Sequence, residues 1–377
     1  MKKILFIIRD FRQGGIPRCM QSLLPFIDNR RFEVDLLCLH QDGPYEGQMR
    51  NCHVIEQDAI LYHLLSFSKD LSPISDFKTI CYKLIDRCFS AVTNKSWLNR
   101  RIEFICDKLS GKYDDVVAYS EGIAAQIASK ISCKKRIVWI HNDYAYECAR
   151  GDKGTSFECF DKIVCVSHAT HRSFENIFPE LKAKICTIYN VINDEFICRS
   201  ATCGDANEII DRYYNIISVG RVCYQKNFII IPEIISSLPE SIKHQIRWYI
   251  CGSGPEEEVE ALKSKIYELG VSDACILLGA KDNPYPYIAK ADLFVLTSVY
   301  ESYPTVINEA LVLGTPVISV DIPPVHEMLT DDKIFPLESM ATAIANEFHS
   351  LRGYSKWEGA NSHNRKVVLQ VEELLDS

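Results

Sequence analysis

A chain of 377 residues is longer than one hydrophobic core usually supports and fits two domains of ordinary size. Its composition, 47% hydrophobic and 24% charged residues, is that of a globular protein and excludes a disordered chain. The net charge of −8 argues against a nucleic-acid-binding protein, because phosphate backbones are bound by basic surfaces.

The N-terminal residues predict a first β-strand rather than a signal peptide. The apolar run Ile4–Ile8 ends at Arg9 and Asp10, short of the about 7–15 residues of a signal peptide's apolar core. No stretch approaches the roughly 18 apolar residues of a membrane span. The 16 cysteines include no Cys-x-x-Cys element, and so many thiols are best tolerated in a reducing compartment. We therefore expect a cytoplasmic protein.

Short apolar runs alternate with helical patterns along the whole chain. The runs are continuous, which is typical of strands buried on both faces of a parallel sheet. Strands that alternate with helices form βαβ units, so the sequence predicts two parallel α/β domains in tandem. The predicted strands are Ile4–Ile8, Val34–Leu39, Val116–Tyr119, Ile137–Ile140, Ile163–Val166, Ile185–Tyr189, Ile216–Val219, Arg247–Cys251, Cys275–Leu278, Leu293–Leu296 and Val317–Val320.

The domain boundary is predicted in a polar segment, about Asp194–Asp211, that has little hydrophobic periodicity. Residues 1–192 would form the first domain and residues 193–355 the second. A C-terminal helix, about residues 356–377, would pack back on the first domain. Two such domains facing each other leave a cleft at the carboxyl ends of their strands, where ligands of parallel sheets bind.

The region Tyr62–Leu109 has a helical pattern with cationic side chains among its apolar positions. One interpretation is a solvated helical face, which is what most charge runs are. The other is a surface that faces a membrane or an acceptor. The cations are Lys83, Arg87, Lys95, Arg100 and Arg101.

Gly14 and Gly15 follow the first predicted strand, just before a helix. Glycine lets a backbone approach a ligand, and a helix N-terminus favours an anion. Taken alone, the pattern fits an ordinary turn equally well.

The segment Gly220–Asn227 places two cations, Arg221 and Lys226, directly after a predicted strand. Arginine can bind a diphosphate with two parallel hydrogen bonds, and lysine can add a point charge. The segment lacks the pattern of a P-loop. Two solvated surface cations are the alternative interpretation.

The strongest pattern holds two carboxylates eight residues apart, Glu301 and Glu309, after the strand Leu293–Leu296. A helix is predicted to begin at Pro304 and to end near Gly314, so Glu301 would lie on the loop before it and Glu309 inside it. Paired carboxylates can accept hydrogen bonds from a polyhydroxylated ligand. The N-terminus of this helix, where free amides favour a phosphate, includes Tyr303, Pro304, Thr305 and Val306.

These patterns together, with Gly252-Ser253-Gly254-Pro255-Glu256 between them, resemble the retaining GT-B glycosyltransferases of family 4. The match covers most of the chain and is densest from Gly220 to Val320. Residues 283–287 and 291–296 look closest to bacterial enzymes that build capsule, exopolysaccharide or O-antigen. The resemblance implies two Rossmann-like parallel-sheet domains that face each other across a cleft.

The resemblance also implies roles for individual residues. Arg221 and Lys226 would clamp the donor diphosphate. Glu309 would bind the ribose, and Glu301 would contact the hydroxyls of the donor sugar. The helix N-terminus at 303–306 would lie at the phosphates.

In the first domain, Gly14 and Gly15 would lie under the same phosphates, and His141 would point at the donor sugar. Taken alone, a histidine at a strand end is more often structural. Three features depart from the family pattern. The glycine pair is followed by Ile-Pro-Arg, at residues 16–18, where many relatives carry a small residue and glutamate. Ser302 stands where many relatives have glycine, and residues 321–327 replace a Gly-rich turn.

The implied activity is metal-independent transfer, with retention, of a sugar from a nucleoside diphosphate donor to a saccharide acceptor. UDP-hexose is the favoured donor, and it is a substrate, so no cofactor is expected. The acceptor would be lipid-linked at the inner membrane face, which implies peripheral membrane contact, and no nucleic acid is expected as a partner. An inactive nucleotide-sugar-binding subunit or sensor remains the alternative. A nicotinamide-dependent oxidoreductase is disfavoured because Pro255 interrupts the glycine pattern such enzymes need.

Overall fold

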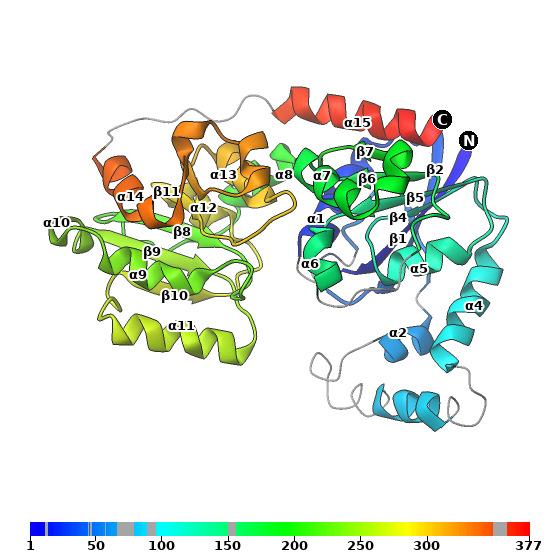
Figure 1. Cartoon of the computed structure of the whole chain (residues 1–377), viewed down its shortest axis with the longest axis horizontal. Helices are drawn as coiled ribbons and strands as arrows, with labels where there is room; N and C mark the ends of the chain where they lie inside the picture. The colour runs from blue at the N-terminus through cyan, green and yellow to red at the C-terminus, as the bar shows by residue number, and fades with distance from the viewer. Residues whose placement is uncertain are drawn as a thin grey trace. The chain divides into compact units, whose positions relative to one another are not determined.

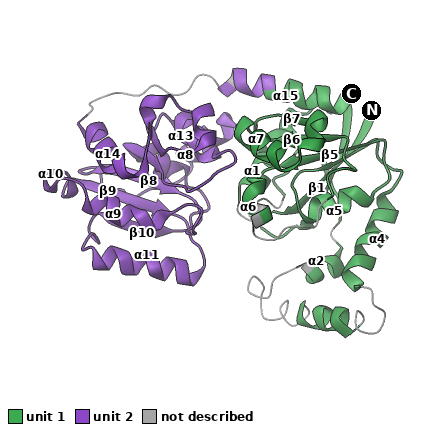
Figure 2. Cartoon of the chain, viewed as in Figure 1, with its two compact units in different colours: residues 1–191, 367–377 green, residues 192–366 purple. Residues whose placement is uncertain are grey.

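The chain folds into two compact units, residues 1–191 with 367–377 and residues 192–366 (Figures 1 and 2). In this computed structural model the described residues are 1–11, 14–43, 45, 47–56, 58–65, 79–88, 96–149, 156–349 and 360–377. The two units are called unit 1 and unit 2 below, in chain order.

Unit 1 contains a parallel sheet with the strand order β3-β2-β1-β4-β5-β6-β7. Its strands are β1 (Lys2–Asp10), β2 (Phe32–His40), β3 (His53–Val54), β4 (Asp115–Ala118), β5 (Lys135–Ile140), β6 (Lys162–Cys165) and β7 (Ile185–Thr187). Every residue of Ile4–Ile8 in β1 is fully buried, as expected for a central strand covered on both faces.

Helices flank this sheet (Figure 1). They are α1 (Gly15–Leu23), η1 (Leu24–Phe26), α2 (Ala59–Leu65), a helix at residues 79–88, α4 (Trp97–Leu109), α5 (Ile123–Lys130), α6 (Tyr144–Ala149), α7 (His168–Ile177) and η3 (Pro179–Lys184). The helical pattern predicted over Tyr62–Leu109 is thus observed at 59–65, 79–88 and 97–109, whereas Lys95 lies outside the described residues.

Unit 2 repeats the arrangement with a second parallel sheet, of order β10-β9-β8-β11-β12-β13. Its strands are β8 (Tyr214–Val219), β9 (Ile246–Cys251), β10 (Cys275–Gly279), β11 (Leu293–Leu296), β12 (Val317–Val320) and β13 (Ile334–Phe335). Its helices are α8 (Asp194–Thr202), η4 (Phe228–Ile230), α9 (Ile231–Ser236), α10 (Glu240–Lys243), α11 (Glu256–Glu268), α12 (Tyr285–Lys290), α13 (Thr305–Leu313), η5 (Pro323–Glu327), η6 (Asp331–Lys333), η7 (Leu337–Ser339) and α14 (Met340–Phe348).

The last helix, α15 (Ala360–Asp376), contributes its first residues to unit 2 and its last to unit 1. In unit 2, the buried Asn364 side chain exchanges two hydrogen bonds with the backbone of Ile192, at 2.9 and 2.6 Å. In unit 1, Glu372 near the other end of the helix pairs with Arg31 at 2.5 Å. Each end is therefore held by polar contacts of its own unit.

The parallel α/β class predicted from the sequence is confirmed, and all the predicted strands are present. Two short strands, β3 and β13, were missed because each has only two residues. The polar segment at 194–211 also contains a helix that was missed, α8. It buries Ile197 alone, so it has little apolar periodicity, and Asn193 caps it by accepting a hydrogen bond from the Phe196 amide at 3.0 Å.

Both sheets have the strand order of doubly wound folds, in which the direction of winding reverses next to the first strand. In unit 1 the reversal lies between β1 and β4, and in unit 2 it lies between β8 and β11. The connections that leave these strand pairs run to opposite sides, which opens a crevice at the carboxyl ends where ligands bind. A ligand-binding site is therefore expected at the loops that follow β1, β4, β8 and β11.

In unit 2 the loop after β8 lies directly against the loop after β9, backbone to backbone. The amide of Val222 donates to the carbonyl of Ser253 at 2.9 Å. A methyl carbon on Gly252 would lie 1.7 Å from the carbonyl oxygen of Gly220, and one on Gly254 would lie 1.8 Å from that of Val222. Two glycines thus allow this contact, which sets the path of the loop after β8.

We predict that Gly252→Ala destabilises the protein by about 2–3 kcal/mol, because it combines a backbone clash with a positive φ of 156°. Denaturant unfolding measures the change. Gly15→Ala is the matched control, since a methyl carbon there would meet no heavy atom within 4 Å. Equal unfolding midpoints for the two variants would contradict the close contact of the loops.

Candidate functional site

The loop after β8 presents two cations in different settings. Arg221 is exposed, and Lys226 is half-buried. The lysine stem passes over Gly220, where a methyl carbon would lie 3.1 Å from Lys226 Cε. Asn227, the next residue, has a left-handed backbone with φ of 54° and leads into η4. The loop thus turns sharply just after the lysine.

Lys226 forms an ion pair with Glu301 from the loop after β11, and the pair is mostly buried, with side chains 16% and 8% exposed. Ser298 donates to the same carboxylate oxygen, Oε1, at 2.7 Å. A backbone hydrogen bond from Val299 to Gln225, at 2.8 Å, joins the same two loops. Separating the two side chains would leave a buried charge without its partner, which is strongly unfavourable. The ion pair and the hydrogen bonds therefore hold both side chains in place.

Helix α13 begins directly after this loop, with Pro304 at its N-cap and no side chain capping its amides. The amides of Thr305 and Val306 lie in its first turn, where a helix carries partial positive charge. Tyr303 is fixed by Asn308, whose side-chain amide donates to its hydroxyl at 3.1 Å. The arrangement suits an anion placed above the helix start.

Glu309 lies in the middle of α13 and is only 3% exposed. Its neighbours Ile307 and Ala310 are fully buried. A carboxylate in such surroundings needs hydrogen-bond donors. The helix therefore has amides without a side-chain cap at its start and a buried carboxylate one turn further on.

In unit 1, His141 follows β5 at the carboxyl edge of the sheet. The backbone amide of His141 donates to Oε2 of Glu121 at 3.0 Å, and the side chain of Asn142 donates to Oε1 of the same carboxylate. The imidazole packs on the ring of Tyr119, with centroids 4.9 Å apart. Burial lowers the pKa of His141 to about 3, so the ring is neutral at pH 7. Its Nε2 atom is buried and has no hydrogen-bond partner among the described residues.

Gly14 and Gly15 lie between β1 and α1, and both are exposed. Gly14 has an extended backbone, with φ of 163°, which any residue can adopt. Neither position is crowded, since the nearest heavy atom to a methyl carbon on Gly14 is 4.0 Å away and none lies within 4 Å of one on Gly15. The described part of unit 1 therefore does not itself require glycine at these two positions.

The predicted site residues fall into two groups. In unit 2, the loops after β8 and β11 bring Lys226 and Glu301 into contact, with Arg221 on the first loop and α13 following the second. In unit 1, the glycine pair follows β1, and His141 follows β5. Both groups stand at the carboxyl edge of their own sheet, at or beside the point where the winding reverses.

Sequence reasoning missed the residues that hold these groups. Glu121 belongs to no motif, and its one signal is a carboxylate placed shortly after the predicted strand Val116–Tyr119. Ser298 follows β11, but its contact with Glu301 depends on the loop conformation. Glu121 accepts from the backbone amide of His141, and Ser298 donates to the carboxylate of Glu301, but spacing alone did not single out either residue.

The described residues show neither a membrane-spanning helix nor a cluster suited to a metal ion. None of their helices is long and apolar enough to cross a membrane. Within the same residues, no cluster of three or more His, Cys, Asp or Glu side chains is placed to hold a metal ion. Each of the 16 cysteines is a free thiol.

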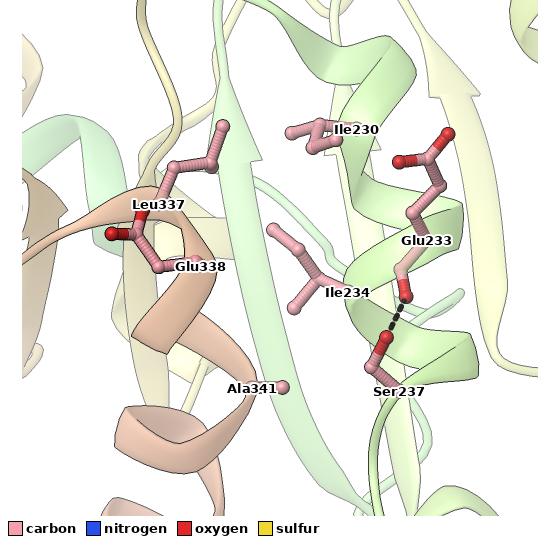
Figure 3. A pocket seen from close by; sticks show the side chains of 7 residues that line it. All are labelled: Ile230, Glu233, Ile234, Ser237, Leu337, Glu338 and Ala341. Atoms are coloured by element: carbon pink, nitrogen blue, oxygen red, sulfur yellow. Dashed lines mark hydrogen bonds between the residues drawn. The ribbon is translucent and has the colours of Figure 1, made fainter.

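A cavity of about 300 Å³ in unit 2 lies elsewhere, between α9 and the η7–α14 segment (Figure 3). No predicted site residue lines it. Its charged side chains are the carboxylates of Glu233 and Glu338, and Glu233 pairs with Lys265 at 2.6 Å. A lining that is acidic and otherwise mainly apolar does not suit a diphosphate. The lining residues are Ile230, Glu233, Ile234, Ser237, Leu337, Glu338 and Ala341.

Comparison with known proteins finds similarity to glycosyltransferases. Residues 205–351 match the family model described as Glycosyl transferases group 1. The chain is 25% identical, over 85% of its length and 81% of the relative's, to N-acetylgalactosamine-N,N'-diacetylbacillosaminyl-diphospho-undecaprenol 4-alpha-N-acetylgalactosaminyltransferase from Campylobacter jejuni. It is 24% identical, over 82% of its length and 76% of the relative's, to UDP-Gal:alpha-D-GlcNAc-diphosphoundecaprenol alpha-1,3-galactosyltransferase from Escherichia coli.

Among solved structures, HepE from Anabaena in complex with UDP-glucose matches with a TM-score of 0.71 and 15% identity. The match covers 100% of this chain and 98% of that one. The fold is therefore GT-B, with its two parallel sheets. The family model thus matches most of unit 2, and the two relatives that match over most of this chain are themselves glycosyltransferases.

The buried neutral histidine predicts a pH dependence of stability. The pKa of His141 in the folded protein, about 3, lies below its ordinary value of 6.5, so below pH 6.5 the unfolded chain binds a proton that the folded chain does not. The free energy of unfolding therefore falls as the pH decreases. Between pH 7 and pH 5 this histidine accounts for a loss of up to about 2 kcal/mol.

His141→Gln removes this contribution, so urea unfolding of the variant should lose less stability than the wild type between those two pH values. His349→Gln, at an exposed histidine for which no ion pair is observed among the described residues, is the control and should follow the wild type. If His141→Gln loses as much stability as the wild type, the imidazole is not held neutral by burial.

Proposed function

We propose that the protein transfers a hexose from UDP-hexose to a hydroxyl of a lipid-linked saccharide, with retention of the anomeric configuration. One observation carries the proposal. Two cations and the uncapped start of α13 stand at the same edge of the unit 2 sheet, beside the buried carboxylate Glu301. A diphosphate needs positive charge and amide donors, and a sugar needs acceptors next to them.

Charge stabilisation is the main chemical task, because the leaving group is a nucleoside diphosphate. Arg221, exposed on its loop, can donate two parallel hydrogen bonds to phosphate oxygens. Lys226 has three ammonium donors, and Glu301 engages one of them. The amides of Thr305 and Val306 add the partial charge of the helix start. These groups supply the positive charge without a metal ion.

The carboxylates are proposed to bind hydroxyl groups. Glu301 uses its Oε1 atom for Lys226 and Ser298, which leaves Oε2 for a hydroxyl of the donor sugar. Glu309, further along α13, would accept the ribose hydroxyls. In unit 1, the neutral His141 would accept or donate one hydrogen bond to the sugar through Nε2, with its backbone oriented by Glu121.

Retention is proposed from the resemblance to retaining GT-B enzymes, and none of the carboxylates in the proposed set of residues is proposed as a nucleophile for a double displacement. Glu301 is already engaged by a lysine and a serine, which makes it a poor nucleophile. We therefore propose displacement on the same face of the sugar, with the departing diphosphate held by Arg221 and Lys226, instead of the double displacement of retaining glycosidases.

Donor and acceptor are proposed from the similar proteins. The relatives from Campylobacter jejuni and Escherichia coli are named for acceptors that carry a diphospho-undecaprenol lipid. The second is named for UDP-galactose, and the similar Anabaena structure holds UDP-glucose. A UDP-hexose donor and a lipid-linked saccharide acceptor accord with these names. The product would belong to a bacterial capsule, exopolysaccharide or O-antigen, as the sequence resemblance implies. The acceptor would place the enzyme at a membrane surface.

Calorimetry with UDP and GDP, in the presence of EDTA, tests the site. We expect UDP to bind the wild type and to bind Arg221→Ala and Glu309→Ala at least tenfold more weakly, since each variant loses a charge-assisted contact. Arg212→Ala is the matched control, because Arg212 is exposed and lies just before β8, at the amino end of the same sheet. This control should bind like the wild type.

Equal binding by all three variants, or no nucleotide binding at all, would sink the donor site. Binding without turnover, when an α-configured donor and a lipid-linked acceptor are supplied, would favour the sensor or inactive subunit instead. With turnover, proton NMR of the product distinguishes retention, which gives an α-linked sugar, from inversion.

A further inference from the structure

The cavity of unit 2 combines an apolar lining with carboxylates at an open mouth. It lies between α9 and the η7–α14 segment, and its volume is about 300 Å³ (Figure 3). Leu337 is 37% exposed and Glu338 beside it is exposed, so side chains from outside can reach the cavity. The apolar lining consists of Ile230, Ile234, Leu337 and Ala341.

The charge at this cavity is negative and only partly neutralised. Glu233 on α9 forms an ion pair with Lys265 at 2.6 Å. Glu338 on η7 forms no ion pair with any residue that the structure describes. The cavity therefore suits a ligand that joins aliphatic side chains to positive charge.

The helix at residues 79–88 of unit 1 is attached to its neighbours through polar and aromatic side chains. The hydroxyl of the fully buried Thr79 lies 3.1 Å from Nδ1 of His63 on α2. The ring of Tyr82 stacks on that of His63, with centroids 5.3 Å apart. Oδ1 of Asp86 accepts from the backbone amide of Leu98 at 3.1 Å, near the start of α4. Residues 79, 82 and 86 therefore form the inner face of the helix.

The opposite face presents large aliphatic and cationic side chains to solvent. Ile80 and Leu84 are 49% and 52% exposed, Arg87 is exposed, and Lys83 is half-buried. These four residues follow the spacing i, i+3, i+4 and i+7, by which an amphipathic helix fills an apolar groove of a partner. A helix normally turns such a stripe to its own core, so we expect another surface to cover this one.

The cavity and the outer face of this helix are complementary in charge and polarity. The cavity offers apolar volume beside a carboxylate that lacks a cation. The helix offers aliphatic side chains and two cations, and its one acidic side chain, Asp86, is already engaged at α4. Two copies of the helix face placed opposite each other would instead bring like charges together, which disfavours a symmetric pairing.

We propose that the outer face of the helix, formed by Ile80, Lys83, Leu84 and Arg87, docks in the unit 2 cavity of a second copy of this chain. The aliphatic side chains enter the cavity, and the cations pair with Glu338. The contact is heterologous, because it joins two different surfaces, so a pair of copies keeps one helix and one cavity free. It requires neither donor nor acceptor and does not depend on the proposed function.

The size of the contact sets its strength. A helix of ten residues buries less than the about 1,600 Å² of a standard protein–protein interface. Association is therefore weak and depends on protein concentration. Since each pair keeps two free surfaces, it also extends beyond two copies at high concentration.

Sedimentation equilibrium tests the association. The weight-average mass of the wild type should rise above that of one chain as the concentration increases. Two double variants, Ile80→Glu/Leu84→Glu in the helix and Leu337→Lys/Glu338→Lys at the cavity, should each weaken association at least tenfold. Each removes apolar contacts and places like charges opposite each other.

A mixture of these two variants distinguishes a heterologous contact from a symmetric one. The helix variant keeps its cavity, and the cavity variant keeps its helix. The mixture should therefore form pairs, although each variant alone stays monomeric. Larger assemblies should not form, because the pair has no intact surface left.

Tyr267→Glu/Leu369→Glu is the matched control for the helix variant. Its two residues are 82% and 58% exposed on α11 and α15, and the variant adds the same two charges. It should associate within twofold of the wild type. A wild type that is monomeric at every concentration, a mixture that stays monomeric, or an equal loss in the control would overturn the proposal.

Circular dichroism and UDP binding separate a folding defect from a lost contact. A helix variant that keeps the wild-type spectrum and binds UDP but does not associate supports the contact. If the two glutamates unfold the helix, Ile80→Ser/Leu84→Ser removes the same apolar contacts without adding charge, and wild-type association by this variant overturns the proposal. Failure of the wild type to bind any nucleotide refutes the donor site alone, whatever the mass shows.

Discussion

The candidate donor site depends on a contact between two backbones that leaves no space for a side chain. The loop after β9 approaches so closely that its Gly252 lies against the carbonyl of Gly220. This contact fixes the start of the loop after β8, and Lys226 then runs back over Gly220 to meet Glu301. This backbone contact between the loops after β8 and β9 thereby restricts the path of the loop that carries the two cations.

Electrostatics complete the arrangement. Lys226 and Glu301 largely neutralise each other, whereas Arg221 is exposed and the amides at the start of α13 have no side-chain cap. The region is therefore suited to an anion without holding a surplus of buried positive charge. In unit 1, His141 stays neutral because burial lowers its pKa to about 3, so this side chain can form hydrogen bonds but adds no charge near pH 7.

The sequence predicted most of the fold because continuous apolar runs, such as Ile4–Ile8, are a strong signal for buried parallel strands. It also located α13, whose ends are marked by Pro304 and Gly314. What it missed depends on contacts that are distant in sequence, as between Glu121 and His141, and on elements with little periodicity. The helix at 79–88 was also beyond prediction from sequence in one respect. Its large apolar residues are exposed, and the spacing of apolar residues does not show which face of a helix packs against the rest of the protein.

A crystal structure of the protein with UDP tests the central claim most directly. The account predicts the diphosphate above the amides of Thr305 and Val306, within hydrogen-bonding distance of Arg221 and Lys226, and the ribose on Glu309. UDP bound anywhere else, for example in the cavity lined by Glu233 and Glu338, with this edge of the unit 2 sheet empty, would contradict it.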